Sequence, residues 1–430
     1  MASRFDVIVV GSGSAGSTAA IAAARAGASV LLLEKLPFLG GVSTAVLDTF
    51  YGFYTPVSIA KKVVGGIGDD VVAGLRGLGP VVERPNTYRA GTRITYLAEH
   101  LKLVWEELVE EAGAKILLHA FVQDATVVDG RIVDLVVATK AGLLSVEGSI
   151  VIDASGDADV CHHAGFRYEL AGEISPAQTL TTTFRMTNVD VSRRQTITKD
   201  ELHGLMADAR ADFDLPRLEG SDHITPIGDM TATIMTRVEH VQKRNGRVVN
   251  ASDPEVLTAA EIAGRRQAFE YARFLIDRVP GYEEASLVAL STQIGVRETR
   301  RVFGDYRVTR EDVTTARQFD DQIGLCGAPI EDHGVGTNTT WEYLPEGQAV
   351  GIPLRSLVVA DSSNTLVAGR CFSATHDAHA SIRSMAQCMA MGQAAGVLAA
   401  MASQSGAVRS VDAAAVRAQL RANGAVLELG

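Results

Sequence analysis

The segment that most constrains the fold lies near the N-terminus, where an apolar run leads into closely spaced glycines. Residues 5–10 are mostly apolar, as expected for a strand buried on both faces, and residues 11–16 form a GxGxxG pattern. An alanine-rich stretch of helix-permissive composition covers 15–28, and a second apolar run over 29–33 ends at Glu34. This order of strand, turn, helix, strand and acid predicts a dinucleotide-binding βαβ unit of the Rossmann type.

Each glycine of the pattern has a separate physical role. Gly11 permits the tight turn, Gly13 lets the backbone approach a pyrophosphate, and Gly16 lets the helix lie close to the strand. The helix N-terminus offers free N–H groups and a partial positive charge to phosphates, and Glu34 can accept hydrogen bonds from a ribose diol. FAD and NAD sites share this pattern, so it does not choose between them, and a glycine-rich turn without a ligand is the alternative.

Composition and charge limit the classes of partner. At roughly 150 residues per domain, a chain of 430 residues predicts two or three domains, and 47% apolar residues allow a large core. The formal net charge of -11 argues against a nucleic-acid partner and against an anionic membrane surface. The four cysteines are far apart, which indicates neither a disulfide framework nor a zinc site.

The same features predict a cytoplasmic protein. The N-terminus shows no charged region followed by an apolar run and a cleavage site, so we expect no secretory signal. The most apolar late stretch, 385–401, contains Gln387 and Gln393 and is too short and polar for an expected membrane span. Thiols without partners are consistent with a reducing compartment.

The order of the apolar runs predicts an α/β fold in which a discontinuous Rossmann-type domain surrounds an inserted α+β domain. We assign 1–175 and 341–430 to the first domain and 176–340 to a substrate or cap domain. The expected helices cover 95–112, 199–213, 253–279, 381–402 and 412–421, and the expected later strands cover 115–122, 125–128, 131–139, 143–147, 149–154, 179–186, 302–308 and 365–368.

Four stretches of the chain resemble a known family. They are GSGSAG…LLLEK at the start, LGGVSTA at 39–45, IVIDASGDADVCHHAG at 150–165 and TLVAGRCFSATHDAHASIRSMAQCMAMGQAAG at 365–396. Together they resemble the FAD-dependent oxidoreductases of the glutathione-reductase-like superfold, which have fumarate-reductase flavoproteins among their distant relatives. The resemblance spans nearly the whole chain and implies FAD as the cofactor.

The resemblance also implies where FAD lies. The pyrophosphate would lie over residues 11–16, the adenosine ribose on Glu34, the adenine at Val122, and the flavin beside the start of the late helix. The expected cofactor residues are Gly11, Ser12, Gly13, Ser14, Ala15, Gly16, Glu34, Lys35, Gly41, Val42, Ser43, Val122, Ala154, Ser155, Gly156, Asp157, Gly369, Arg370 and Ala386. Many members of the superfold have Gly-Asp after the late strand, whereas this chain has Gly369-Arg370, which leaves the role of the arginine open.

The candidates for catalysis precede the late helix. His376, His379 and Arg383 lie next to the expected flavin, where a histidine can take a proton and an arginine can orient an anionic substrate. The alternative is that these side chains cap the helix and pair with one another. A metal site at the two histidines with Asp377 has no third cluster to support it, and we predict no metal.

Other residues leave further alternatives open. Arg297, Arg300 and Arg301 either act in proton transfer or form ion pairs, and His333 lies on a glycine-rich loop that either closes on substrate or is a simple turn. We expect Cys388 to pack as a small apolar group beside the flavin, and no feature of the sequence demands a covalent flavin bond.

The predicted function is hydride transfer between a small organic substrate (an alcohol, amine, sugar or acid) and flavin N5. The alternatives are a flavin-dependent monooxygenase and a non-redox flavin-bound binding or RNA-modification protein. The expected partners are the substrate and an electron acceptor that the sequence does not identify, with self-association left open, and we expect no nucleic-acid or membrane partner.

Overall fold

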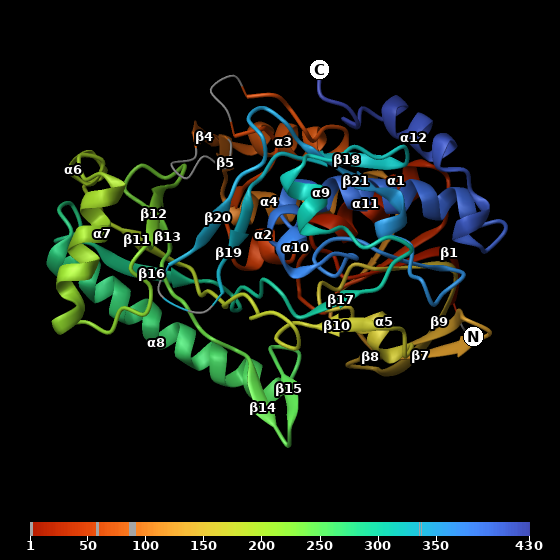
Figure 1. The fold of residues 1–430 in the computed structure, drawn as a ribbon, viewed down its shortest axis with the longest axis horizontal. Helices are drawn as coiled ribbons and strands as arrows, with labels where there is room; N and C mark the ends of the chain where they lie inside the picture. The colour runs from red at the N-terminus through yellow and green to blue at the C-terminus, as the bar shows by residue number, and fades with distance from the viewer. Residues whose placement is uncertain (1–2, 57–59, 86–91, 335, 337) are drawn as a thin grey trace.

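A seven-stranded sheet organises the larger part of the molecule in the computed structural model (Figure 1). The structure describes residues 3–56, 60–85, 92–334, 336 and 338–430. The strand order is β6-β2-β1-β9-β8-β7, with β22 also paired to β9, and β7 and β8 are antiparallel to their neighbours while the other pairs are parallel. The sheet consists of β1 Ser3–Val10, β2 Val30–Leu33, β6 Lys115–Leu117, β7 Phe121–Val128, β8 Arg131–Thr139, β9 Gly142–Asp153 and β22 Thr365–Val367. The predicted α/β class with a Rossmann-type βαβ unit is confirmed.

The two faces of the sheet bury different residues of the same strands. Val7 and Val9 of β1 contact the core under the helices, whereas Ile8 and Val10 contact the core formed with β7, β8 and α5. This alternation explains why the opening run is apolar on both faces. The helices of the larger part are α1 Ser14–Arg25, α2 Val42–Ala45, α3 Ile67–Leu78, α4 Ala98–Glu111, α5 Asp159–His163, α9 Arg310–Thr314, α10 His376–Ile382, α11 Met385–Ala402 and α12 Ala413–Ala422.

Helices α1 and α11 pack directly on each other. A Cβ at Gly392 would lie 2.0 Å from the carbonyl oxygen of Ala15, and one at Gly396 would lie 2.3 Å from that of Ala19. These glycines are therefore required by helix–helix contact. By length and composition, α11 is the one helix of the described residues able to cross a membrane, but 83% of it is buried, as in the core helix of a soluble fold.

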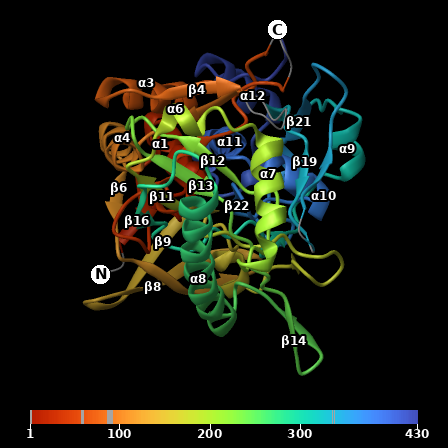
Figure 2. The same ribbon diagram turned by 90° about the vertical axis from the view of Figure 1, so that its left-hand side faces the viewer.

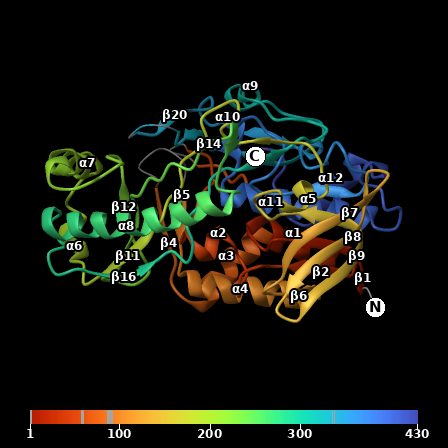
Figure 3. The same ribbon diagram turned by 90° about the horizontal axis from the view of Figure 1, so that it is seen from below.

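Residues 184–290 form a separate lobe, at the left of Figure 1, whose helices α7 and α8 face the viewer in Figure 2. Its sheet is antiparallel, in the order β12-β13-β11-β16. The elements are β11 Phe184–Thr187, α6 Val191–Arg194, α7 Lys199–Asp208, a 3-10 turn Ala209–Ala211, β12 Ser221–Ile224, β13 Thr231–Ile234, β14 Gln242–Arg244, β15 Arg247–Val249, α8 Pro254–Arg278 and β16 Ser286–Leu290. In Figure 3, α8 runs along this lobe toward the central sheet.

Short strand pairs connect distant parts of the chain. In one of them, β5 Thr92–Thr95 pairs with both β3 Thr49–Phe50 and β4 Val82–Pro85. The other pairs are β10 Tyr168–Leu170 with β17 Arg300–Val302, β18 Gln322–Cys326 with β21 Val350–Pro353, and β19 Ile330–Asp332 with β20 Thr340–Glu342. Two further 3-10 turns cover Leu354–Ser356 and Val408–Ser410. The domain boundaries at 175 and 340 stay a prediction.

Several predicted elements need correction. The strands expected over 143–147 and 149–154 are one strand, β9, and the strand expected over 115–122 is divided at His119, which has a φ of 54°. The strand expected over 302–308 ends at Val302. The strand expected over 179–186 begins only at Phe184, and the helix expected over 199–213 ends at Asp208.

The helix expected over 381–402 agrees with α11 from Met385 to Ala402. Its first residues differ, because residues 381 and 382 end a separate short helix, α10. The final helix agrees with the expectation, because Asp412 accepts a hydrogen bond from the Ala414 N–H at its start.

Candidate functional site

One cavity opens at the carboxyl ends of the parallel strands β1, β2, β9 and β22, where ligands of open α/β sheets bind. Its volume is about 340 Å³, within the range of small-molecule sites. Most residues predicted to hold the cofactor line it, namely Gly11, Ser12, Gly13, Ser14, Ala15, Glu34, Lys35, Gly41, Val42, Val122, Ala154, Ser155, Gly156, Asp157, Gly369 and Arg370. The exceptions are Gly16, Ser43 and Ala386, which do not line the cavity.

The three glycines of the GxGxxG pattern have different surroundings. A Cβ at Gly11 would lie 2.5 Å from the Ala154 carbonyl oxygen, and one at Gly16 would lie 1.7 Å from the Gly11 carbonyl oxygen. Both glycines are therefore required by contacts within the protein. A Cβ at Gly13 would meet no protein atom within 4 Å, and Gly13 lines the cavity. The absence of a side chain at Gly13 thus leaves room for a ligand.

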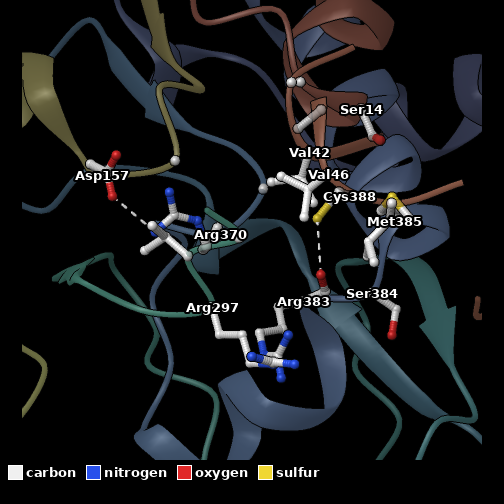
Figure 4. Close-up of a pocket in the computed structure, with 18 of the residues that line it drawn as sticks. Ser14, Val42, Val46, Asp157, Arg297, Arg370, Arg383, Ser384, Met385 and Cys388 are labelled. Atoms are coloured by element: carbon white, nitrogen blue, oxygen red, sulfur yellow. Dashed lines mark hydrogen bonds and ion pairs between the residues drawn. The ribbon is translucent and has the colours of Figure 1, made fainter. Parts of the chain in front are cut away.

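Two helices begin at the cavity without side-chain caps. Gly13 precedes α1 and Ser384 precedes α11, and no side chain accepts a hydrogen bond from the first N–H groups of either helix. Figure 4 shows Ser14 of α1 and Met385 of α11 at the same pocket. At the start of α11 the Ala386 N–H donates to the Tyr51 carbonyl oxygen at 3.4 Å. The helix dipole and the remaining N–H groups make both ends suitable for a negatively charged group, such as a pyrophosphate or a reduced flavin.

The carboxylate of Glu34 is held by the backbone and by Ser12. It accepts hydrogen bonds from the Ser12 N–H at 2.8 Å, the Ser12 hydroxyl at 2.6 Å and the Leu36 N–H at 2.8 Å. A carboxylate has about four lone-pair sites, so this one retains capacity for a ribose hydroxyl. Its contact with ribose stays a prediction.

Arg370, whose role the sequence left open, forms an ion pair with Asp157. Its Nη1 lies 2.9 Å from Oδ1 of Asp157 and donates to the Thr299 hydroxyl at 3.3 Å (Figure 4). Burial raises the pKa of Asp157, but the Arg370 guanidinium and Lys35 lower it further, so the carboxyl pKa lies below its usual value. The arginine therefore supports one of the loops that line the cavity.

Two of the three predicted catalytic side chains do not line the cavity. His376 contacts the Glu298 carboxylate through Nδ1 at 3.0 Å and Asp332 through Nε2 at 3.3 Å. His379 donates from Nε2 to the Arg370 carbonyl at 2.8 Å, and burial lowers its pKa well below the usual value. Direct proton transfer by either histidine therefore has no support in the geometry.

Arg383, the third candidate, does line the cavity. Its Nη2 donates to the Gln178 amide oxygen at 2.7 Å. Cys388 also lines the cavity, where burial raises its pKa to about 12 and its thiol lies 3.5 Å from the Arg383 carbonyl oxygen. This neutral thiol packs as the sequence suggested.

The three arginines of the segment 296–301, VRETRR, separate into two groups. Arg301 forms ion pairs with Glu298 and Glu169, and Arg300 lies 3.1 Å from Asp159. Arg297 instead lines the cavity. Ion pairing thus accounts for two of the three, and only Arg297 faces the space that a ligand would fill.

A histidine–glutamate pair also lines the cavity. His333 Nε2 lies 2.9 Å from Glu331 Oε1, and Nδ1 lies 3.1 Å from the Thr339 hydroxyl. Burial and Arg297 lower the pKa of His333 to about 3, so its ring is neutral. Burial raises the pKa of Glu331, but His333 and then Arg383 and Arg297 lower it to about 2. The sequence had indicated His333 but not Glu331, since no local motif marks that residue.

Arg217 is a further lining residue that the sequence analysis missed. It lies between α7 and β12 and comes to the cavity through the fold of the separate lobe. Within the described ranges of the chain, no group of three or more His, Cys, Asp or Glu side chains could hold a metal ion.

The sequence is similar to those of known proteins. Residues 6–420 match the family model described as FAD dependent oxidoreductase. A digeranylgeranylglycerophospholipid reductase from Thermoplasma acidophilum is 27% identical over 248 residues, which are 55% of this chain and 59% of that protein. A cytochrome-type fumarate reductase from Shewanella frigidimarina is 45% identical over 58 residues, or 14% of this chain and 10% of that protein.

The chain also aligns with a solved structure. A geranylgeranyl bacteriochlorophyll reductase-like protein from Thermoplasma acidophilum superposes with a TM-score of 0.48 and 14% identity, over 98% of this chain and 83% of that one. The family match covers most of the sequence and agrees with the resemblance carried by the four motifs. The chain therefore belongs to the family of FAD-dependent oxidoreductases, and FAD is its cofactor.

Proposed function

We propose that this oxidoreductase transfers a hydride between flavin N5 and a small organic substrate bound in the same cavity. The observation that carries the proposal is the continuity of the cavity. It extends from Gly13 and Glu34, beside the uncapped start of α1, to Arg217, Arg297 and other residues that lie outside the βαβ unit. One space of this kind can hold a cofactor and place a substrate against it.

Some residues of the cavity would bind FAD, and others would orient the substrate. The free N–H groups of α1 would hold the pyrophosphate, and Glu34 and Val122 would hold the adenosine. The start of α11, at Met385, would lie against the flavin, where its partial positive charge favours the reduced anionic form. FAD supplies the hydride-accepting centre, and Arg297 and Arg383 would orient the substrate toward it.

Anaerobic mixing tests the proposal and its direction. The oxidised holoenzyme is mixed with alcohols, amines, sugars and acids while the flavin absorbance is followed, and bleaching identifies a dehydrogenase or oxidase. The chemically reduced holoenzyme is mixed with unsaturated acceptors, and anaerobic return of the absorbance identifies a reductase. NADPH consumption coupled to incorporation of oxygen into a substrate would identify a monooxygenase instead and contradict hydride transfer to or from the substrate.

A further inference from the structure

Three guanidinium groups gather at the end of the cavity away from Glu34. Arg217 follows α7, Arg297 precedes β17, and Arg383 joins α10 to α11, so distant parts of the chain bring them together. The side chains of Arg297 and Arg383 point to the same part of the pocket in Figure 4, and their charges are close enough to act on each other. We call Arg217, Arg297 and Arg383 the arginine cluster.

The arginine cluster forms no ion pair with any carboxylate of the described residues. All of its hydrogen bonds go to neutral oxygens. The acceptors are the carbonyl oxygens of Thr179 and Ile234, the hydroxyl of Thr181 and the amide oxygen of Gln178. The buried Nε atoms of Arg217 and Arg383 have no acceptor within the part of the chain that the structure describes. Each of these two guanidiniums therefore retains an unused donor as well as its charge.

The charge of the arginine cluster is compensated only in part, by Glu331, and its burial has an energetic cost. Burial, followed by repulsion from Arg383 and Arg217, lowers the pKa of Arg297 well below its usual value. Elsewhere in the cavity, Arg370 is paired with Asp157. Because buried charges in proteins are normally paired, three neighbouring unpaired guanidiniums indicate that a ligand supplies the missing negative charge.

Carboxylates of the protein do not fill this role. Glu331 lines the same end of the cavity, and its charge acts on Arg383 and Arg297, but it forms no direct ion pair with them. Its nearest partner is the neutral ring of His333, at 2.9 Å. Glu219 also lines it and accepts a hydrogen bond from the Thr339 N–H at 3.3 Å. Neither forms an ion pair with the arginine cluster, so space and charge remain for an external anion.

Apolar side chains also line the cavity. Several are aliphatic or aromatic, and they come from both the separate lobe and the larger part of the molecule. They include Val46, Leu47, Ile234, Leu257, Ile294 and Trp341. A ligand that satisfies the guanidiniums and also buries these side chains must combine an anionic head with an apolar body.

We propose that the substrate is an organic oxyanion, a carboxylate or a phosphate on an apolar body, whose head is bound by Arg217, Arg297 and Arg383. Planar guanidiniums bind both head groups through paired N–H···O bonds. The inference rests on the proposed function, since it names the class of substrate that occupies the same cavity. It also explains why Arg383 directly precedes α11: the anchored head holds the body of the substrate beside the predicted flavin position.

A matched set of six-carbon ligands tests the proposal on the FAD-loaded protein. Hexanoate, hexyl phosphate, hexanamide and hexylamine are titrated while flavin difference absorbance and calorimetric heat are recorded. We expect saturable binding of hexanoate or hexyl phosphate, with the stronger of the two identifying the head group, and weaker binding of the amide and amine. Equal binding of hexanamide, or no binding of either anion up to millimolar concentration, would overturn the proposal.

Substitutions assign the binding to the arginine cluster. Arg297→Gln and Arg217→Gln should each weaken anion binding by about ten- to a hundredfold, because a hydrogen bond to a charged group is lost. Lysine at either position should restore part of the affinity. Arg247, exposed on β15, provides the matched control, and R247Q should bind the anion as the wild type does.

The flavin content separates this inference from the proposed function. If the glutamine variants retain FAD and also retain full anion affinity, the arginine cluster is not the anchor. If substrates bleach the flavin but neutral ligands bind as well as anions, hydride transfer stands and the substrate class is wrong. If the wild-type protein binds no FAD, the proposed function itself fails.

Discussion

Gly13 offers the most direct test of where the cofactor lies, because neither the backbone conformation nor contacts within the protein require a glycine there. Its φ is -59°, which any residue adopts, and a Cβ there would contact no protein atom within 4 Å. Gly13→Ala should therefore change the free energy of unfolding of the apoprotein by only about 1 kcal/mol or less. A larger loss of FAD affinity in a Gly13 variant must therefore come from contact between the new side chain and FAD.

Gly13→Glu adds a negative charge at the predicted pyrophosphate position. Two like charges about 4 Å apart repel by about 4 kcal/mol at an effective dielectric constant of about 20. This energy weakens binding about a thousandfold. The variant should therefore purify without its yellow colour, and FAD titration of the apoprotein should show little binding.

Two comparison variants make the result specific. Gly204→Glu, on the exposed surface of α7 with no atom within 4 Å of its Cβ, adds the same charge elsewhere and should retain full FAD. Gly16→Ala should instead lower the free energy of unfolding, because its Cβ would overlap the Gly11 carbonyl oxygen. Full flavin occupancy in purified Gly13→Glu would refute our placement of the pyrophosphate.

Three further predictions concern charge and protonation. Arg370→Ala leaves Asp157 without its main cation and should lower the free energy of unfolding by about 1–3 kcal/mol near pH 7. Because the pKa of the Asp157 carboxyl is lowered in the folded state, the ion pair contributes fully above about pH 4 and its contribution is lost in stronger acid. The urea unfolding curves of the variant and the wild type should therefore converge as the pH falls. His333, with a pKa of about 3, should show no NMR titration between about pH 5 and 8, and because only the unfolded state binds its proton there, it should destabilise the fold progressively below about pH 6.5. Cys388, with a pKa of about 12, should resist alkylation near pH 8 in the folded holoenzyme and react after unfolding, as mass spectrometry of the labelled peptide would show.

The part of the site that the sequence predicted is the part made by local structure. The opening βαβ unit is continuous, so the positions of Gly11 and Glu34 relative to the helix follow from strand, turn and helix geometry alone. The central strand β9 was predicted as two strands because of the glycine at 148. In the structure a Cβ at Gly148 would lie 2.8 Å from the Ile8 side chain, so this glycine serves packing within a continuous strand and does not end one.

The catalytic role of the two histidines was predicted from their proximity in sequence to the late helix and stays a prediction. His376 and His379 precede α11 closely in sequence, which suggested that they face the flavin. They lie three positions apart on α10, and they contact Glu298 and the Arg370 carbonyl and do not line the cavity, whereas Arg383, beyond the end of that helix, does. The break between α10 and α11 falls at Arg383 and Ser384, and Ser384 is of a residue type that is favoured at the start of a helix.

The arginine cluster shows what tertiary structure adds to the sequence. The chain as a whole carries a formal charge of -11, from which we predict that polyanions such as nucleic acids are repelled. Yet Arg217, Arg297 and Arg383, separated by 80 and 86 positions, bring positive charge to one end of a single cavity. A protein of net negative charge with a local cluster of guanidiniums in its cavity would discriminate by size as well as by charge, because only an anion small enough to enter the cavity reaches the guanidiniums. This selectivity for small anions depends on the arginine cluster. Substituting its three arginines with neutral residues should therefore remove the selectivity, although the net charge of the protein then becomes more negative.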